Sequence, residues 1–261
     1  MTERDEETPP EPSPGPEGYH PDVTVSREDI ELGESGEADF AAADTNPVAD
    51  ESVDGLLAAL EAADATERQR ATLALSEREP GEDVRDALAD RATDDPEALV
   101  RQFAVEALGD LAETTPDAVV AALSDADPWV RAEAVVALDH LDREAHAERI
   151  EAGLDDDHHA VRRNAVISLW KSRSEDALPA LLALADDEAD RVREWVAELL
   201  GRIDHPDAED ALKELRADEE SVVAKTAANA LDGPDATPGP PGGTAPDGTN
   251  PAGSKDQPPQ L

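Results

Sequence analysis

The sequence has no cysteine, a single tyrosine, two phenylalanines and only four lysines among its 261 residues. The missing cysteine excludes disulfides, thiolate metal sites and cysteine nucleophiles on this chain. No apolar run approaches the roughly 18 residues that a membrane-spanning helix needs. The first residues, MTERDEETPP, also lack the apolar segment of a signal peptide. We therefore expect a cytoplasmic protein with no membrane partner.

Basic residues are also scarce. The chain has 22 Lys and Arg against 64 Asp and Glu, which gives a formal net charge of -42. Such a surface repels nucleic-acid backbones, so we expect no nucleic-acid partner. An acid-rich, lysine-poor surface resembles that of proteins from salt-loving archaea, because carboxylates are well screened when salt is molar. The other interpretation is an ordinary acidic cytosolic protein.

What the sequence does contain is a repeat. The stretch LSDADPWVRAEAVVAL (residues 123–138) recurs as an Asp, a Val-Arg pair, an Ala and an Ala-Leu pair. The positions equivalent to its Val are 67, 100, 130, 161, 192 and 223. A fixed period in this range is typical of stacked repeat proteins. Apolar residues three and four apart indicate helices, and no segment alternates as a strand would.

We predict an all-α fold, a right-handed α-solenoid of six helix–turn–helix repeats of about 31 residues over residues 52–232. The predicted helix pairs are 52–62 and 65–78, 81–92 and 96–111, 116–123 and 128–141, 143–154 and 159–171, 175–185 and 189–203, and 206–215 and 219–231. Residues 1–51, which are rich in acids and proline, and residues 233–261, which are rich in proline and glycine, are predicted to be disordered tails.

One stretch of the first tail stands apart. Residues 19–32 (YHPDVTVSREDIEL) have some β-branched character. They either lack structure like their neighbours or dock as a short motif on a partner or on the protein's own groove.

One Asp and one Arg recur in each interior repeat, six residues apart. We predict that the Asp caps the second helix and forms a bidentate pair with an Arg of an adjacent repeat. A structural ladder of this kind is favoured over an anion site, because a ligand site rarely recurs at every repeat. Its members are Asp95, Asp125, Asp156, Asp187, Asp218, Arg68, Arg101, Arg131, Arg162 and Arg193. Ala62 and Ala224 replace the Asp and the Arg in the two end repeats, where one neighbour is missing.

The segment from His158 to Ser174 contains no acid, although it has four Lys and Arg residues. On each second helix we expect the positions two, three, six, nine and ten after the Val to be exposed on the concave face. In repeats three to five they predict a semi-apolar, locally basic partner surface, since Trp and Arg are favoured anchors. Its members are Val136, His140, Arg163, Asn164, Ile167, Trp170, Lys171, Trp195 and Arg202. Alternatively, the two tryptophans simply pack between repeats.

The repeat pattern over residues 52–232 resembles the HEAT-like repeat of the phycobilisome-lyase type. The resemblance implies an α-solenoid whose second helices line a concave face. Deoxyhypusine hydroxylase, which has a similar architecture, binds iron through His-Glu dipeptides, and this sequence has none. The residues Asp155–His159 could ligate a metal locally, but solvated loop residues are the expected reading. We expect no metal and no cofactor.

These observations predict a monomeric, non-enzymatic scaffold or adaptor that binds a protein partner on the concave face of repeats three to five. The alternative is an enzyme or enzyme accessory related to bilin lyases or to deoxyhypusine hydroxylase. A structural spacer without a specific partner is a third possibility.

The charge of the repeats predicts a dependence on salt. Residues 52–232 contain 45 acids and 19 Lys and Arg, a net charge of -26 that repels itself in dilute buffer. Circular dichroism at 222 nm should show helix lost or loosened below about 0.5 M salt, where screening weakens. Full helicity and an unchanged melting temperature in dilute buffer would contradict the interpretation of a salt-adapted surface.

Overall fold

The computed structural model describes residues 45, 48–78, 81–112 and 114–232. The predicted tails therefore lie outside the described residues, except for residues 45 and 48–51. The described residues are organised in helices and contain no strand, so the prediction of an all-α solenoid is confirmed. Among their helices, none is both long and apolar enough to cross a membrane.

The helices form six consecutive pairs, in the order that the repeat predicts. The pairs are α2 (Val53–Ala59) and α3 (Ala65–Ser76), α4 (Glu82–Asp94) and α5 (Ala98–Leu111), α6 (Asp117–Ala122) and α7 (Pro128–Asp142), α8 (Ala147–Ala152) and α9 (His159–Arg173), α10 (Leu178–Ala183) and α11 (Asp190–Leu200), and α12 (Pro206–Leu215) and α13 (Ser221–Asp232). Short 3-10 helices extend the first helices of repeats four and five: η2 (Gly153–Asp155) and η3 (Ser174–Ala177).

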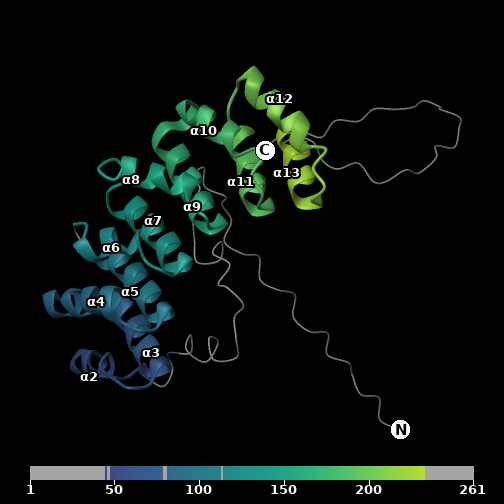
Figure 1. Cartoon of the computed structure of the whole chain (residues 1–261). Helices are drawn as coiled ribbons and strands as arrows, with labels where there is room; N and C mark the ends of the chain where they lie inside the picture. Colours follow the sequence, from purple (N-terminus) through teal and green to yellow (C-terminus); the bar gives the residue numbers. More distant parts are fainter. Residues whose placement is uncertain (1–44, 46–47, 79–80, 113, 233–261) are drawn as a thin grey trace, which may run out of the picture.

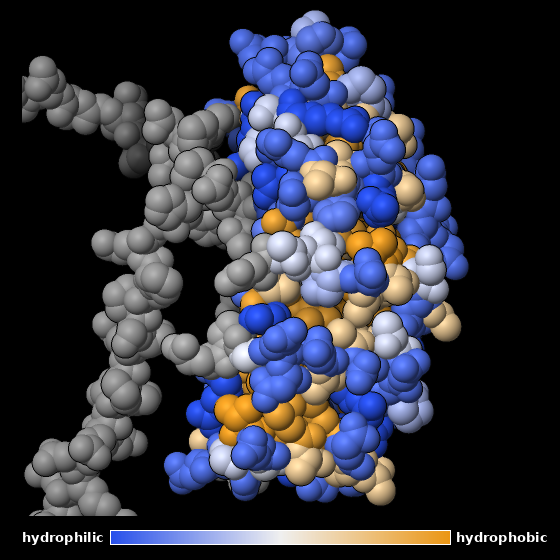
Figure 2. All heavy atoms as spheres, turned by 90° about the vertical axis from the view of Figure 1, so that its left-hand side faces the viewer, coloured by the Kyte–Doolittle hydropathy of each residue, from blue (hydrophilic) through white to orange (hydrophobic). Residues whose placement is uncertain are grey.

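The pairs stack into a curved array. Figure 1 shows the first helices of the repeats on the outer side of the curve and the second helices on its inner side. The second helices are α3, α5, α7, α9, α11 and α13. Each interior second helix contacts the second helices of the two neighbouring repeats. Figure 2 shows the outer face, where hydrophilic side chains predominate and hydrophobic ones gather in small areas between them. The inner side is therefore built from one row of second helices.

Side-chain caps explain where several helices begin. The capping side chain accepts a hydrogen bond from a backbone N–H group in the first turn, which would otherwise lack a partner. The capping residues and the residues whose N–H groups they accept from are Ser52 and Gly55, Asp64 and Glu67, Asp127 and Trp129, and His205 and Asp207. Most of the expected helix starts are wrong by one to four residues. The largest differences are in repeats four and five, where α8 begins at Ala147 and not at Arg143, and α10 begins at Leu178 and not at Glu175. In repeats two and three, α5 begins at Ala98 and not at Pro96, and α6 begins at Asp117 and not at Pro116.

The apolar core consists of two clusters. The first extends from Leu56 to Ala165 and the second from Val136 to Ala227. Both clusters include residues of α7 and α9, so the core is continuous along the stack. Most members are Ala, Val and Leu, and the small alanines allow neighbouring helices to approach closely.

Two glycines lie where neighbouring second helices approach each other closely. Gly109 and Gly201 both lie nine residues after the Val of their repeats. A Cβ atom added to Gly109 would lie 2.9 Å from the Cβ of Ala137 and 3.1 Å from its Cα. At Gly201 it would lie 2.6 Å from the Cβ of Ala230. Neither neighbour is a flexible side chain, so only glycine fits at these positions without a shift of the helices.

We predict that Gly109→Ala destabilises the protein although alanine is the better helix former. The helical gain is about 1 kcal/mol, whereas overpacking costs about 1–3 kcal/mol. Gly55→Ala is the matched control, because the atoms nearest to its new Cβ belong to the flexible side chain of Glu51. Urea unfolding at constant salt should show a lower midpoint for Gly109→Ala and an equal or higher one for Gly55→Ala. Equal midpoints for both variants would refute the close approach of α5 and α7.

Candidate functional site

The ladder arginines pair with the ladder aspartates of the following repeats. In each pair the Nε and Nη2 groups of the Arg donate to the two carboxylate oxygens of one Asp, at 2.7–2.9 Å. The pairs are Arg68 with Asp95, Arg101 with Asp125, Arg131 with Asp156, Arg162 with Asp187, and Arg193 with Asp218. This two-pronged geometry fixes both the distance and the orientation between adjacent repeats.

Each ladder pair also stabilises two turns, one in each of the two repeats that it connects. The Nη1 group of each ladder Arg donates to a backbone carbonyl six residues earlier in its own repeat, at 2.8–3.1 Å. Each ladder Asp accepts a hydrogen bond from the backbone N–H two residues later, at 2.8–2.9 Å. One guanidinium therefore connects the turn of its own repeat to the turn of the next.

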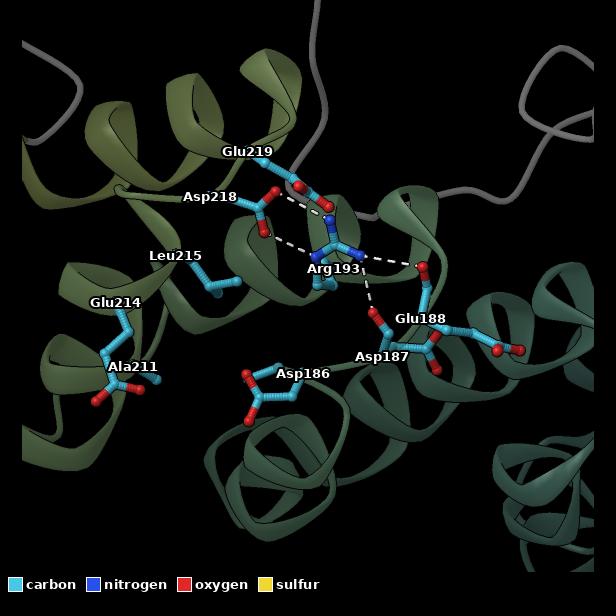
Figure 3. Close-up of a pocket in the computed structure, with 10 residues that line it drawn as sticks. Asp186, Asp187, Glu188, Arg193, Ala211, Glu214, Leu215, Asp218 and Glu219 are labelled. Carbon is cyan, nitrogen blue, oxygen red and sulfur yellow. Dashed lines mark hydrogen bonds and ion pairs between the residues drawn. The ribbon is translucent and has the colours of Figure 1, made fainter.

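Figure 3 shows the last pair. The Arg193 side chain lies between the carboxylate of Asp218 and the carbonyl oxygens of Asp187 and Glu188. The hydrogen bonds from Arg193 hold the pKa of Asp218 below its ordinary value, although burial opposes this. The same bonds raise the pKa of Arg193. Each partner therefore favours the charged form of the other.

The pair lines a pocket of about 360 Å³ between repeats five and six. Arg193 is the one base among the lining residues, and its guanidinium is occupied by the pair. The other charged lining residues are Asp186, Asp187, Glu188, Glu214, Asp218 and Glu219. Among the described residues, no group of three or more His, Asp and Glu side chains is placed to hold a metal ion. The pocket is thus an acidic recess beside the ladder.

The expected exposure of the inner surface needs correction. Val136, Arg163, Asn164 and Ile167 are all buried, with exposed fractions of 0–6%. Val136 and Ile167 belong to the second core cluster, where α7 meets α9. The Asn164 amide donates to the carbonyl oxygen of Ala132 on α7, and Arg163 Nε donates to Asn164 Oδ1. These four side chains cannot contact a partner in this state of the protein.

The other five predicted surface residues retain exposure. His140 and Arg202 are exposed, and Trp170, Lys171 and Trp195 are half-buried. The guanidinium of Arg202 lies 5.2 Å from the centroid of the Trp170 ring, a cation–π arrangement. Both tryptophans pack against the second core cluster with part of their surface. Trp170 and Trp195 therefore pack between repeats and keep part of their surface exposed.

The acid-free segment is not a free basic patch, because acids of other elements pair with its bases. Arg162 pairs with Asp187, as part of the ladder. Lys171 Nζ lies 2.8 Å from Asp139 Oδ2, and Arg173 pairs with Glu151 at 2.7 Å. The expectation of a locally basic surface is therefore wrong. The cations of this segment thus reach acids of α7, α8 and the turn before α11.

The carboxylate of Asp139 is the centre of a buried polar cluster that the sequence analysis missed. Its side chain is 3% exposed and accepts hydrogen bonds from Arg143, Ser168 and Lys171. Burial opposes its charge, but these three donors together lower its pKa from 3.8 to about 2. The available signal was the spacing of 32 residues between Asp139 and Lys171, one repeat apart.

The histidine turn also differs from the expected solvated loop. His158 and His159 are half-buried, with ring centroids 4.5 Å apart. The Trp129 ring lies edge-on to both, at 5.0 Å from His158 and 6.2 Å from His159. Burial lowers the pKa of His158, with a further contribution from His159. The ring of His158 thus packs on Trp129 at the start of α7 in the preceding repeat.

Comparisons with known proteins agree with this architecture. The family model for HEAT repeats matches residues 91–170, 116–199 and 147–232, which together span more than half of the chain. Among curated proteins, none matches the chain in sequence.

Solved structures supply the second comparison. YibA from Escherichia coli is similar over 77% of this chain and 77% of its own, with 20% identity and a TM-score of 0.57. The CpcE–CpcF complex of phycocyanin lyase from Nostoc sp. is matched over 69% of this chain and 76% of that chain, with 20% identity and a TM-score of 0.49. A designed armadillo repeat protein is matched over 69% and 99%, with 21% identity and a TM-score of 0.43. At such identities, the similarity to YibA supports the solenoid fold alone.

The Asp139 cluster predicts a specific loss of stability in acid. A carboxyl whose pKa is lowered on folding stabilises the protein above its unfolded pKa, and this contribution disappears as the pH falls through the folded pKa. The Asp139 carboxyl therefore loses its contribution to the free energy of unfolding between about pH 4 and pH 2. At neutral pH this contribution is about 2–3 kcal/mol. Asp139→Asn should lower the free energy of unfolding by at least about 2 kcal/mol at pH 6, with the difference from wild type shrinking toward pH 2.

Urea unfolding at fixed molar salt and several pH values measures this difference. The control is Asp110→Asn, because Asp110 is 58% exposed and makes only a 3.8 Å contact with His140. This control should stay within about 0.5 kcal/mol of wild type. A difference for Asp139→Asn that is small at pH 6, or that does not depend on pH, would show that the cluster does not stabilise the fold.

Proposed function

Because this chain belongs to the family of HEAT-repeat proteins, we propose that it is a non-enzymatic scaffold that binds a protein partner on the inner side of repeats three to five. The single observation that carries the proposal is the group formed by Trp170 and Arg202. Here an aromatic ring of repeat four and a guanidinium of repeat five lie 5.2 Å apart in a cation–π arrangement. Such side chains are the most common anchors of protein interfaces.

The partner surface consists of His140, Trp170, Lys171, Trp195 and Arg202. Its tryptophans are held on one side by the second core cluster, so a partner would meet them in a fixed orientation. Rigid anchors lose little conformational entropy on binding, which favours affinity. The ion pair with Asp139 fixes the Lys171 side chain, which therefore contributes to the rigid support of the partner surface. Arg202 also pairs with Glu198 at 3.0 Å, which leaves the planar face of its guanidinium on Trp170.

The proposal includes the setting of the protein. We infer that the protein is a cytoplasmic monomer. We also infer that its acidic surface is suited to molar salt, as in salt-loving archaea, because the ladder uses five of the arginines and leaves the outer carboxylates in excess. The enzymatic alternative, a relative of bilin lyases or of deoxyhypusine hydroxylase, is not favoured by any contact among the described residues. The metal and chromophore content of the purified protein discriminates between the two classes.

We predict that Trp170→Ala weakens partner binding by about 2 kcal/mol, or roughly 30-fold. Its cost to the fold should stay below the 3–5 kcal/mol that is typical of a fully buried tryptophan. The measurement is recovery of partners by the immobilised full chain from native lysate at molar salt, followed by titration with the partner recovered. Trp129→Ala is the matched control, since this tryptophan is also half-buried but lies at the opposite end of its helix.

Arg202→Glu is the second variant, because Arg202 is exposed and its replacement should leave the fold intact. It should reduce binding as Trp170→Ala does, while Trp129→Ala should bind like wild type. Undiminished binding by both Trp170→Ala and Arg202→Glu would remove this surface as the interface.

A further inference from the structure

The second helices of repeats three and four, α7 and α9, are connected at both of their ends. At the C-terminal ends, the Asp139 cluster joins the two helices. At the N-terminal ends, the ring of His158 packs on Trp129, with ring centroids 5.0 Å apart. The ladder pair of Arg131 with Asp156 lies beside this contact, because the backbone N–H of His158 donates to the same Asp156 carboxylate. A titratable side chain therefore takes part in the connection at each end.

The ring of His158 also caps α9. The backbone N–H of Ala160 donates a hydrogen bond to His158 Nδ1 at 3.4 Å. Only the neutral imidazole can accept this bond, because both ring nitrogens carry hydrogen atoms in the imidazolium. A proton on the ring also places a positive charge at the N-terminus of a helix, where the helix dipole disfavours it. Protonation of His158 therefore opposes the cap of α9.

Four titratable or charged side chains act on the His158 ring. His159 and Arg131 oppose its protonation, whereas Asp156 and Asp157 favour it. Both acids pair with Arg131, at 2.8 and 2.6 Å, so the guanidinium offsets their attraction for a proton on the ring. Burial is the largest cause of the lowered pKa of His158, and His159 contributes next. The surroundings of the ring therefore favour its neutral form.

The two ends of the connection respond to different ranges of pH. The pKa of Asp139 is about 2, so its cluster stays charged in mild acid. The ordinary pKa of a histidine is about 6.5. A histidine whose pKa is lowered on folding stabilises the protein above its unfolded pKa, and this contribution is lost as the pH falls below that value. Mild acid therefore acts on the His158 end alone.

We propose that His158 makes the joint between repeats three and four sensitive to pH near neutrality. The neutral ring caps α9 and packs on Trp129. Its protonation releases both contacts and loosens the start of α9, while the Asp139 cluster still holds the other end of the helix. The angle between repeats three and four is then less fixed. This conformational device goes beyond the proposed scaffold function and does not depend on it.

The first test compares two capping histidines by urea unfolding in molar salt. His205 caps α12 by accepting from the Asp207 N–H at 3.1 Å, but its side chain is 44% exposed. The wild-type midpoint should fall between about pH 7.5 and about pH 5.5, on either side of the ordinary histidine pKa. His158→Asn keeps a capping oxygen without a titratable ring, so it should lose most of this fall. His205→Asn, the matched control, should keep it.

The second test observes the joint in the native protein. The chain has three tryptophans, and the indole N–H signal of Trp129 in NMR spectra can be assigned with Trp129→Phe. We expect this signal to shift with the same pH midpoint as the ring signals of His158, while the signal of Trp195 keeps its position. In His158→Asn the shift of the Trp129 signal should be lost.

Two outcomes would overturn the proposal. One is a fall of the urea midpoint in His158→Asn that equals the fall in wild type, since another group would then cause the pH dependence. The other is a Trp129 signal that does not move in the wild-type chain, or that still moves in His158→Asn because His159 alone titrates beside it. The wild-type spectra decide the first part of this outcome even if the variant folds poorly.

Discussion

The bidentate pair between an arginine of one repeat and an aspartate of the next is the interaction on which this structure depends. Each first-helix-to-second-helix turn must satisfy backbone groups close to the surface, and each repeat must be held at one angle to its neighbour. The guanidinium does both, because its fork takes the next repeat's carboxylate while its third nitrogen takes a carbonyl of its own turn. The direction of the pairs also fits the end of the ladder: the last repeat has Ala224 at the Arg position, and within residues 114–232 no further ladder aspartate lies beyond it.

The ladder pairs also affect the balance of charge on the surface of the repeats. The repeats contain 45 acids and 19 Lys and Arg, and the ladder commits five of those cations to partners between repeats. Lys171 and Arg173, which the sequence suggested as free charges, are also paired. The remaining carboxylates therefore outnumber the remaining cations, and the stack must hold together against their repulsion. Salt that screens this repulsion acts on the surface far more than on the partly buried pairs.

The sequence predicted those features of the structure that recur from repeat to repeat. The period of 30 to 33 residues gave the helix pairs and placed each Arg one repeat from an Asp, and in the structure those side chains do pair. It did not predict the burial of Arg163, Asn164 and Ile167, because the same positions are open in repeats five and six. Burial there depends on contacts that are not periodic. The cluster around Asp139 was missed for a similar reason: its donors, Arg143, Ser168 and Lys171, form a combination that this one junction provides.

The most direct test of the ladder compares two adjacent aspartates that pair with the same arginine. Arg131 contacts Asp156, which is 16% exposed, and Asp157, which is 91% exposed. If the ladder holds the repeats together, Asp156→Asn should lower the free energy of unfolding by about 2–3 kcal/mol, whereas Asp157→Asn should change it by less than about 1 kcal/mol. Equal and small effects of the two substitutions, measured by urea unfolding in molar salt, would contradict this account.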